Sequence, residues 1–243
     1  MSILKAENIS KSFGNKNVLN SVSIELKEGE VVALIGVSGG GKTTLFNILS
    51  GIYTPDTGRV YLNGEDITGT PGKISYMLQK DLLFPHKKVI DNVSLPLVLN
   101  GMRKKEAREK ADELFETFGI DGIQYSYPDE LSGGMRQRAA FLRTYLSSNG
   151  VALLDEPFSA LDTFTKSKLH QWYLKVVEKI NLSTLFITHD IDEAIVLSDR
   201  IYILDGGGIS AEIKINAPEP RNVNFNLTNE FLDYKRQILK ILT

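Results

Sequence analysis

The chain has 243 residues, enough for one large domain or two small ones. Apolar residues make up 42% and charged residues 24%, which is typical of a folded globular protein and excludes a disordered or collagen-like chain. Lys and Arg number 28 against 30 Asp and Glu, so the net charge is −2 and no basic excess indicates a nucleic-acid partner. The chain has no cysteine, which excludes disulfides, thiolate zinc sites and a cysteine nucleophile. The N-terminus has no apolar leader and no run of about 18 apolar residues occurs, so we expect a cytoplasmic chain that does not cross a membrane.

The first elements along the chain are expected to be strands. Apolar and polar residues alternate over residues 22–26, and less clearly over residues 3–9, which predicts an antiparallel pair followed by a turn at residues 27–30. The continuous apolar run at residues 31–35 is typical of a parallel strand buried on both faces. A glycine-rich segment and then an apolar helix follow it directly.

The rest of the chain alternates helices with strands. Apolar residues recur at helical spacing over residues 103–118, which predicts an amphipathic helix that ends at Gly119. Strands are expected at residues 74–78, 151–154, 184–188 and 200–204, with a helix over residues 169–180 and a last helix over residues 231–242. Strands that alternate with helices indicate βαβ units and a parallel sheet, so the fold class is α/β.

The glycine-rich segment matches a phosphate-binding loop, in which Gly and four further residues precede Gly-Lys-Ser/Thr. Its candidate nucleotide-binding residues are Gly36, Ser38, Gly39, Gly40, Gly41, Lys42, Thr43 and Thr44. Backbone amides of such a loop close around a triphosphate, Lys42 can reach the β- and γ-phosphates, and Thr43 can bind Mg²⁺. The alternative is a glycine-rich turn with a solvated lysine; the preceding strand and the following helix favour the phosphate site.

Two adjacent carboxylates, Asp155 and Glu156, follow the apolar run at residues 151–154. A parallel sheet places the end of this strand beside the phosphate-binding loop. There Asp155 can hold Mg²⁺ while Glu156 polarises the attacking water as a general base. Two solvated carboxylates after a strand are the alternative interpretation.

A second glycine-containing helix start lies at Ser132, Gly133 and Gly134, with Gln137 one turn further on. Its exposed amides would also suit an anion, and a plain serine-capped helix is the alternative. Here the sequence resembles the ATP-binding cassette (ABC) ATPases, because these residues match the family's signature motif and stand 23 residues before Asp155. In that family the signature of one subunit completes the ATP site of a second, head-to-tail copy, so the resemblance implies a homodimer.

The resemblance extends to four further positions in the family's order. Phe13 stands where the family places an aromatic residue that stacks on adenine, with core packing as the alternative. Gln79 matches the glutamine that contacts Mg²⁺ and the attacking water, although alone it would be an ordinary surface residue. Residues 159–162, ending at Asp162, resemble the loop that communicates across the dimer, or else form a helix cap. His189 matches the switch histidine that contacts the γ-phosphate, whereas a lone histidine after a strand is usually structural.

The family resemblance implies a RecA-like P-loop fold with a parallel sheet, an N-terminal antiparallel β subdomain and an inserted helical subdomain. Residues 1–78 and 150–205 would form the nucleotide-binding core, residues 80–149 the helical subdomain with the signature, and residues 206–243 a C-terminal extension. Two small departures from the family pattern are Phe13, where Tyr is usual, and Gly40, where Ser or another small residue is usual. Neither removes a catalytic side chain.

The resemblance also implies a function, which is to bind and hydrolyse Mg-ATP and to power transport. With one cassette and no membrane segment, the chain is expected to act with integral membrane permease subunits, peripherally on the inner face of the cell membrane. Details of residues 135–138, 155–162 and 188–194, and the segment at residues 219–221, resemble the importers of nitrate, sulfonates, taurine and pyrimidine precursors. An exporter ATPase and a soluble non-transport ATPase are the alternatives, and the sequence does not determine the solute.

Overall fold

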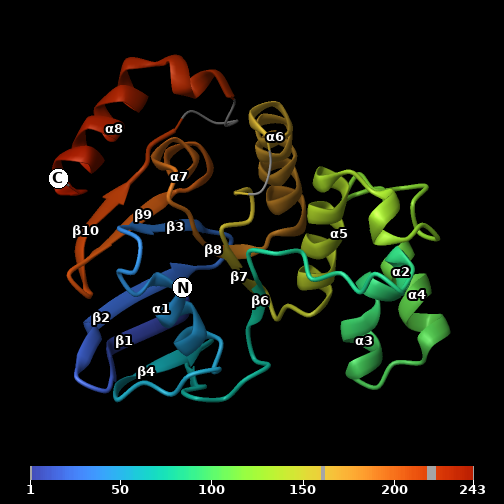
Figure 1. Cartoon of the computed structure of the whole chain (residues 1–243), viewed down its shortest axis with the longest axis horizontal. Helices are drawn as coiled ribbons and strands as arrows, with labels where there is room; N and C mark the ends of the chain where they lie inside the picture. Colours follow the sequence, from blue (N-terminus) through green and yellow to red (C-terminus); the bar gives the residue numbers. More distant parts are fainter. Residues whose placement is uncertain (1, 160–161, 218–222, 243) are drawn as a thin grey trace.

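The computed structural model describes residues 2–159, 162–217 and 223–242 (Figure 1). Two sheets form its framework. The first is antiparallel, in the order β2-β1-β4-β5, and consists of β1 (Ser2–Phe13), β2 (Lys16–Lys27), β4 (Thr57–Leu62) and β5 (Glu65–Asp66). The second has the order β10-β9-β3-β8-β7-β6 and consists of β3 (Val31–Gly36), β6 (Ser75–Met77), β7 (Val151–Asp155), β8 (Ser183–Ile187), β9 (Arg200–Asp205) and β10 (Gly208–Lys214).

The second sheet is parallel except for β10, which pairs antiparallel with β9. The strands expected from the apolar runs are therefore confirmed, and so is the antiparallel start. The sequence pattern did not predict β10. It is a short edge strand, and most of its positions are half-exposed or exposed, so it has no continuous apolar run. It returns along β9 after the turn at Gly206 and Gly207, both of which have positive φ.

β3 shows why the central strands are apolar throughout. Val32 and Leu34 pack into a core between the two sheets, to which α1 (Lys42–Leu49) contributes its apolar face. Val31, Ala33 and Ile35 face the opposite core, beneath the helices on the other side of the sheet. The strand is buried on both faces, which explains the unbroken apolar run.

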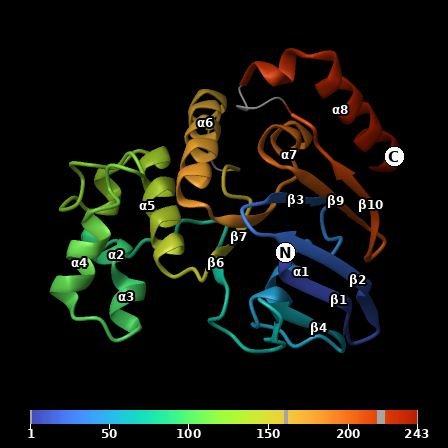
Figure 2. The same cartoon turned by 180° about the vertical axis from the view of Figure 1, so that it is seen from behind.

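The second core is covered by α5 (Gly133–Leu146), α6 (Thr163–Ile180), α7 (Ile191–Leu197) and α8 (Asn229–Leu242). Seen from behind, α2 (Val89–Val93), α3 (Leu95–Leu99) and α4 (Lys104–Asp112) lie at one end of the molecule, beyond α5 and far from the antiparallel sheet (Figure 2). Two short 3₁₀ helices span Pro128–Glu130 and Val223–Leu227. Within the described ranges, no helix is both long and apolar enough to cross a membrane.

The helix expected over residues 103–118 is regular only to Asp112 and continues as tighter turns. Phe115 and Phe118 are fully buried, and several backbone hydrogen bonds in this stretch span three residues, such as that from the Leu114 amide to the Ala111 carbonyl. The predicted end at Gly119 is correct. Its φ is +64°, and the Ile120 amide donates back to the Phe115 carbonyl at 3.0 Å, as at a glycine-capped helix end. The segment at residues 219–221 lies outside the described residues.

Candidate nucleotide-binding site

The phosphate-binding loop lies between the end of β3 and the start of α1, as the sequence predicts. Gly36 closes the strand with a φ of +154°, and a Cβ there would lie 2.1 Å from the Leu204 carbonyl oxygen on neighbouring β9. Gly41 caps α1 in the left-handed region, with β2 directly beneath it. Both positions therefore require glycine, and the loop sets the free amides at the N-terminus of α1 toward solvent.

Lys42 is the first residue of α1 and is buried. Its ammonium group donates to the carbonyl oxygens of Gly36 at 2.9 Å and Val37 at 3.0 Å. Burial lowers the pKa of Lys42, whereas the nearby carboxylates of Glu156 and Asp155 oppose that shift. The cation thus already lies against the loop that is expected to receive phosphates, and these two hydrogen bonds are to neutral carbonyl groups.

Asp155 ends the buried strand β7 and is itself buried. One carboxylate oxygen, Oδ2, accepts a hydrogen bond from the Tyr76 hydroxyl at 3.1 Å and lies 3.5 Å from the Thr43 hydroxyl. Burial raises the pKa of Asp155, and the hydrogen bond from Tyr76 is the strongest influence in the opposite direction. The loop threonine and the strand carboxylate are thereby brought together, as the motif spacing predicts.

The Thr43 hydroxyl and the Asp155 carboxylate, 3.5 Å apart, are hard oxygen ligands of the kind that Mg²⁺ prefers. Within the part of the chain that the structure describes, no cluster of three or more acidic, His or Cys residues could hold a metal alone. Mg²⁺ is usually bound by one or two carboxylates plus substrate phosphates and water, so this sparse donor set fits Mg²⁺ delivered with a nucleotide.

Glu156 is the centre of a cluster at the carboxyl ends of the strands. Its Oε2 accepts a hydrogen bond from Gln79 Nε2 at 3.0 Å and lies 3.4 Å from His189 Nδ1. Gln79 also donates to the Ser159 hydroxyl at 3.3 Å. The structure therefore brings together three side chains that are far apart in the sequence.

The backbone of Glu156 has a φ of +46°, which is unfavourable for a residue with a long side chain. Three hydrogen bonds hold it there. Its amide donates to the Ile187 carbonyl at 3.0 Å, and its own carbonyl accepts from the amide and the hydroxyl of Ser159. Such a strained residue, held by its surroundings, is typical of a functional site.

Phe13 lies at the end of β1, and 47% of its surface is exposed. Its ring contacts the edge of Tyr53 at a centroid distance of 5.7 Å, and the Lys11 ammonium group lies 5.7 Å from the ring centre. This exposure argues against core packing, the alternative for this residue. A half-exposed ring with a supporting aromatic neighbour is available to stack on a planar ligand.

The signature residues lie in another part of the molecule. Ser132 caps α5, its hydroxyl accepting from the Met135 amide at 3.3 Å, and Gly134 faces Thr165 of α6. Figures 1 and 2 both show α5 separated from α1 by β6 and β7. One chain therefore does not bring Ser132, Gly133 and Gly134 to its own phosphate-binding loop.

Asp162 caps α6, and its carboxylate accepts from the amides of Phe164 and Thr165, each at 3.1 Å. Hydrogen bonds from Thr165 hold the pKa of Asp162 below its usual range. The helix-cap interpretation of this tetrapeptide is thus correct for its last residue, while residues 160 and 161 lie outside the described part of the chain.

Sequence reasoning missed two side chains at the site, Tyr76 and Tyr53. Tyr76 reaches Asp155 only because β6 pairs with β7, a register that no local pattern encodes. Tyr53 follows α1, and its ring meets that of Phe13 at the end of β1. The only signal for Tyr76 in the sequence was its aromatic side chain three positions before Gln79.

Comparisons with known proteins agree with this geometry. A family model described as ABC transporter matches residues 19–159, more than half of the chain. The chain is 40% identical, over 98% of its length, to the formylaminopyrimidine import ATP-binding protein ThiZ of Halalkalibacterium halodurans, of which it covers 93%. It is 39% identical over 95% of its length to the aliphatic sulfonates import ATP-binding protein SsuB of Bacillus cereus, covering 90% of it. It is 35% identical over 94% of its length to the nitrate import ATP-binding protein NrtD of a Synechocystis species, covering 89%.

Solved structures give the same result. The dimeric structure of MJ0796, a bacterial ABC transporter cassette, matches with a TM-score of 0.75 and 30% identity, over 88% of this chain and all of that one. A dimeric post-hydrolysis state of the same cassette, bound to ADP and Pi, matches with a TM-score of 0.74 over the same shares. A nucleotide-free cassette at 24% identity matches in fold over the whole chain, with a TM-score of 0.82. The expected fold class and family resemblance are confirmed.

Proposed function

The chain belongs to the ABC transporter family, and we propose that it is the ATP-hydrolysing subunit of an importer that drives uptake of a small solute through separate membrane subunits. The observation that carries the ATPase assignment is the convergence of Gln79, Glu156 and His189 beside the phosphate-binding loop. The importer assignment is supported by relatives named as import ATP-binding proteins, which match nearly the whole chain.

In this proposal ATP binds with its phosphates over the loop from Gly36 to Lys42. Lys42 exchanges its two carbonyl contacts for phosphate oxygens, a gain because charge-assisted hydrogen bonds are stronger than neutral ones. The loop residues Ser38, Gly39, Gly40 and Gly41 line the phosphates together with Thr43 and Thr44, and Phe13 stacks on the adenine. Thr43, Asp155 and Gln79 would hold Mg²⁺, which when bound offsets phosphate charge.

Hydrolysis requires a base for the attacking water, and Glu156 is placed to supply it. Its Oε2 already has two neighbours, the Gln79 amide and the His189 ring, so the carboxylate is oriented before substrate arrives. Gln79 then positions the water and His189 contacts the γ-phosphate. A positioned general base of this kind contributes about 10²–10⁴-fold to the rate.

A second copy of the chain completes the site. Ser132, Gly133 and Gly134 present the N-terminus of α5, which favours an anion, yet their own chain's loop lies elsewhere. In a head-to-tail dimer they would close over the γ-phosphate of the partner's ATP, with the region of Asp162 at the junction. The dimeric cassette structure of a relative supports this arrangement.

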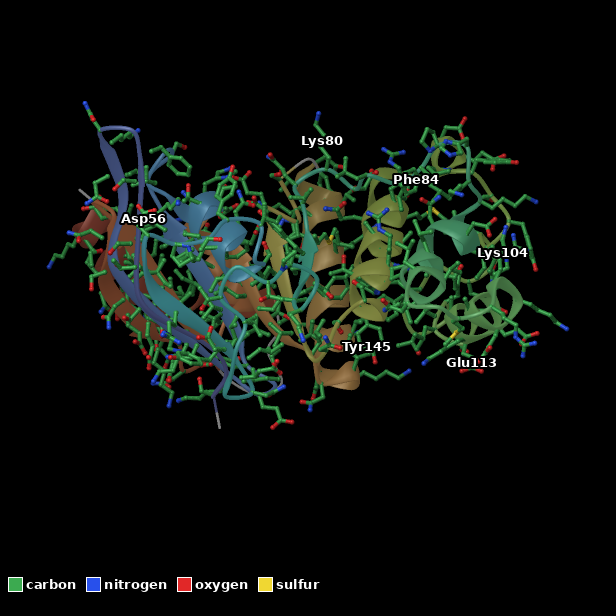
Figure 3. All side chains as sticks on the ribbon, turned by 90° about the horizontal axis from the view of Figure 1, so that it is seen from below. Asp56, Lys80, Phe84, Lys104, Glu113 and Tyr145 are labelled. Carbon is green, nitrogen blue, oxygen red and sulfur yellow. The ribbon has the colours of Figure 1, made fainter. Side chains whose placement is uncertain are left out.

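The segment from Gln79 to Pro96 is suited to transmit this closure to the membrane subunits. Figure 3 shows Lys80 and Phe84 on the opposite edge of the molecule from Tyr145 and Glu113. Leu82 and Phe84 are exposed on this segment, while Arg143 of α5 donates to the Leu82 carbonyl at 2.8 Å. Movement of the segment would therefore be passed to the helix that begins with the signature. In the proposed complex, this docking would hold the chain at the inner face of the membrane.

The named solutes of the relatives include a formylaminopyrimidine, aliphatic sulfonates and nitrate. We assign the solute to this class of small molecules and its selection to the binding protein and the membrane subunits, since none of the cassette residues described above has a proposed contact with the solute.

The test is to co-express the chain with the membrane proteins encoded beside its gene and to reconstitute the complex in proteoliposomes. We expect copurification, ATP hydrolysis stimulated by a solute-loaded binding protein, and solute accumulation on the side opposite the binding protein. The Glu156→Gln complex, as the matched control, should assemble without transport. A chain that never copurifies with these proteins, or a complex that moves solute in the reverse direction, contradicts the importer assignment.

A further inference from the structure

Tyr76 lies in the middle of β6, opposite Leu153 of β7 in the parallel register. The edge of its ring packs against Phe46 of α1 at a centroid distance of 5.9 Å. Phe46 is fully buried, so the ring of Tyr76 is held from the side of α1. This packing aims the hydroxyl at Asp155 Oδ2, 3.1 Å away.

We propose that Tyr76 is a positioning residue that holds the Asp155 carboxylate in the orientation needed to bind the metal ion of Mg-ATP. The inference rests on the proposed function, because it deepens the same site. Tyr76 itself need not touch the ion or the nucleotide.

The hydrogen bonds of Asp155 support this assignment. A buried carboxylate needs donors to remain oriented, and the two side-chain hydroxyls nearby are those of Tyr76 and Thr43. Thr43 is 3.5 Å away, at the outer limit of a hydrogen bond, and its hydroxyl is required by the metal when Mg-ATP binds. Tyr76 is then the donor that remains. Because it uses Oδ2, the other carboxylate oxygen stays available to the metal or its water.

The position of Tyr76 in the chain adds a second argument. Gln79 follows it by three residues, and Gln79 contacts the catalytic Glu156 at 3.0 Å. One short segment therefore holds the metal carboxylate through Tyr76 and the general base through Gln79. A shift of residues 76–79 would change both groups together, so this segment links metal binding to water activation.

The test is the Mg²⁺ dependence of nucleotide binding in Tyr76→Phe, which removes the hydroxyl and keeps the ring. A fluorescent ATP analogue is titrated in EDTA and then at increasing free Mg²⁺. Loss of a hydrogen bond that orients a metal ligand typically costs about 10–100-fold in metal affinity, so the Mg²⁺ midpoint should rise by about that factor. Affinity in EDTA should equal that of the wild type.

Tyr145→Phe is the matched control, because Tyr145 is on α5 with its ring against Phe118, on the opposite edge of the molecule from Lys80 and Phe84 (Figure 3). It should leave the Mg²⁺ midpoint unchanged. In the Asp155→Asn background, Tyr76→Phe should add no further shift, since it acts through Asp155.

The outcomes separate the two claims. If the wild type binds no ATP analogue, the proposed function fails. If the wild type binds it in a Mg²⁺-dependent manner and Tyr76→Phe has the same midpoint, the positioning inference is overturned. An equal loss of affinity in EDTA, or a further midpoint shift in the Asp155→Asn background, also overturns it, because either result indicates general packing. Thermal unfolding of each variant verifies that it is folded.

Discussion

Glu156→Gln is the sharpest perturbation of the proposed chemistry, because the structure limits what it changes. Gln79 Nε2 and His189 Nδ1 both lie against the same oxygen, Oε2. The amide oxygen of a glutamine can occupy that place and keep both contacts. The strained backbone at this position is held by main-chain bonds and the Ser159 hydroxyl, none of which involves the carboxylate. The substitution therefore removes the base and leaves its surroundings intact.

The expected loss in ATP turnover is about 10²–10⁴-fold, the usual contribution of a general base. At about 1.36 kcal/mol per factor of ten, this corresponds to about 2.7–5.4 kcal/mol of transition-state stabilisation. ATP affinity should stay near that of the wild type, because Lys42, Thr43 and the loop amides are unchanged. Since the signature is proposed to close over the γ-phosphate, which only hydrolysis removes, the variant should accumulate as an ATP-bound dimer.

Phosphate release measures the turnover, and size-exclusion chromatography with and without Mg-ATP measures the dimer. Glu178→Gln, an exposed position on α6, is the matched control and should behave as the wild type. Turnover of Glu156→Gln within a factor of about three of the wild type would refute the assignment of the base. A tenfold or greater loss of ATP affinity would show that Glu156 acts in binding instead.

Three further substitutions test other parts of the structure. Phe13→Ala should weaken ATP binding by about 1–3 kcal/mol of base stacking, and Phe13→Tyr should be nearly neutral in a titration with labelled ATP. Asp91→Asn should lower the free energy of unfolding by about 1 kcal/mol at pH 7, because Arg108 hydrogen bonds hold the pKa of Asp91 below its ordinary value of 3.8. The pKa is lower in the folded chain, so this contribution is complete above the unfolded pKa and disappears as the pH falls through the folded value. Arg200→Met should cost about 3–5 kcal/mol in urea unfolding, because it leaves the half-buried Glu30, now 2.8 Å from the guanidinium, without its partner.

A specific result would contradict each of these three predictions. If Phe13→Ala lowers the melting temperature and leaves ATP affinity unchanged, the ring is a packing residue. A difference between Asp91→Asn and wild type that persists unchanged at pH 2 would rule out the ion pair as its cause. Arg59→Met, which removes an exposed partner of Asp66, is the control for Arg200 and should have little effect. Equal losses of unfolding free energy in the two arginine variants would contradict the role of Arg200 as the partner of Glu30.

Much of the fold could be predicted because its central strands are buried on both faces. The run at residues 31–35 and the carboxylates after residues 151–154 identify the parallel strands and the edge where their ends meet. The helix at residues 103–118 shows the limit of this reasoning. Helical spacing correctly places its apolar residues on one buried face, but the pattern does not reveal that the regular helix ends at Asp112.

Much of the site could likewise be located by motif, whereas the contacts within it could not. The family resemblance implies that Gln79, Glu156 and His189 lie near one another, but not that the first two share a hydrogen bond. Tyr76 was unpredictable because its function depends on strand order and register, which are set by long-range packing. The sequence also did not determine whether Asp162 caps a helix, because this depends on where α6 begins.

The central claim is that the signature of one copy completes the site of another, and mixing two inactive variants tests it most directly. Lys42→Ala removes the loop cation, and Gly133→Asp places a carboxylate at the first residue of α5, where the γ-phosphate is expected. Each variant alone should be nearly inactive. In the mixed dimer one site combines both lesions and the other combines two intact halves, so an equal mixture should recover about a quarter of wild-type turnover if the sites act independently. No recovery of turnover or of ATP-dependent dimers, with both variants folded and the membrane subunits present, would contradict the sandwich dimer.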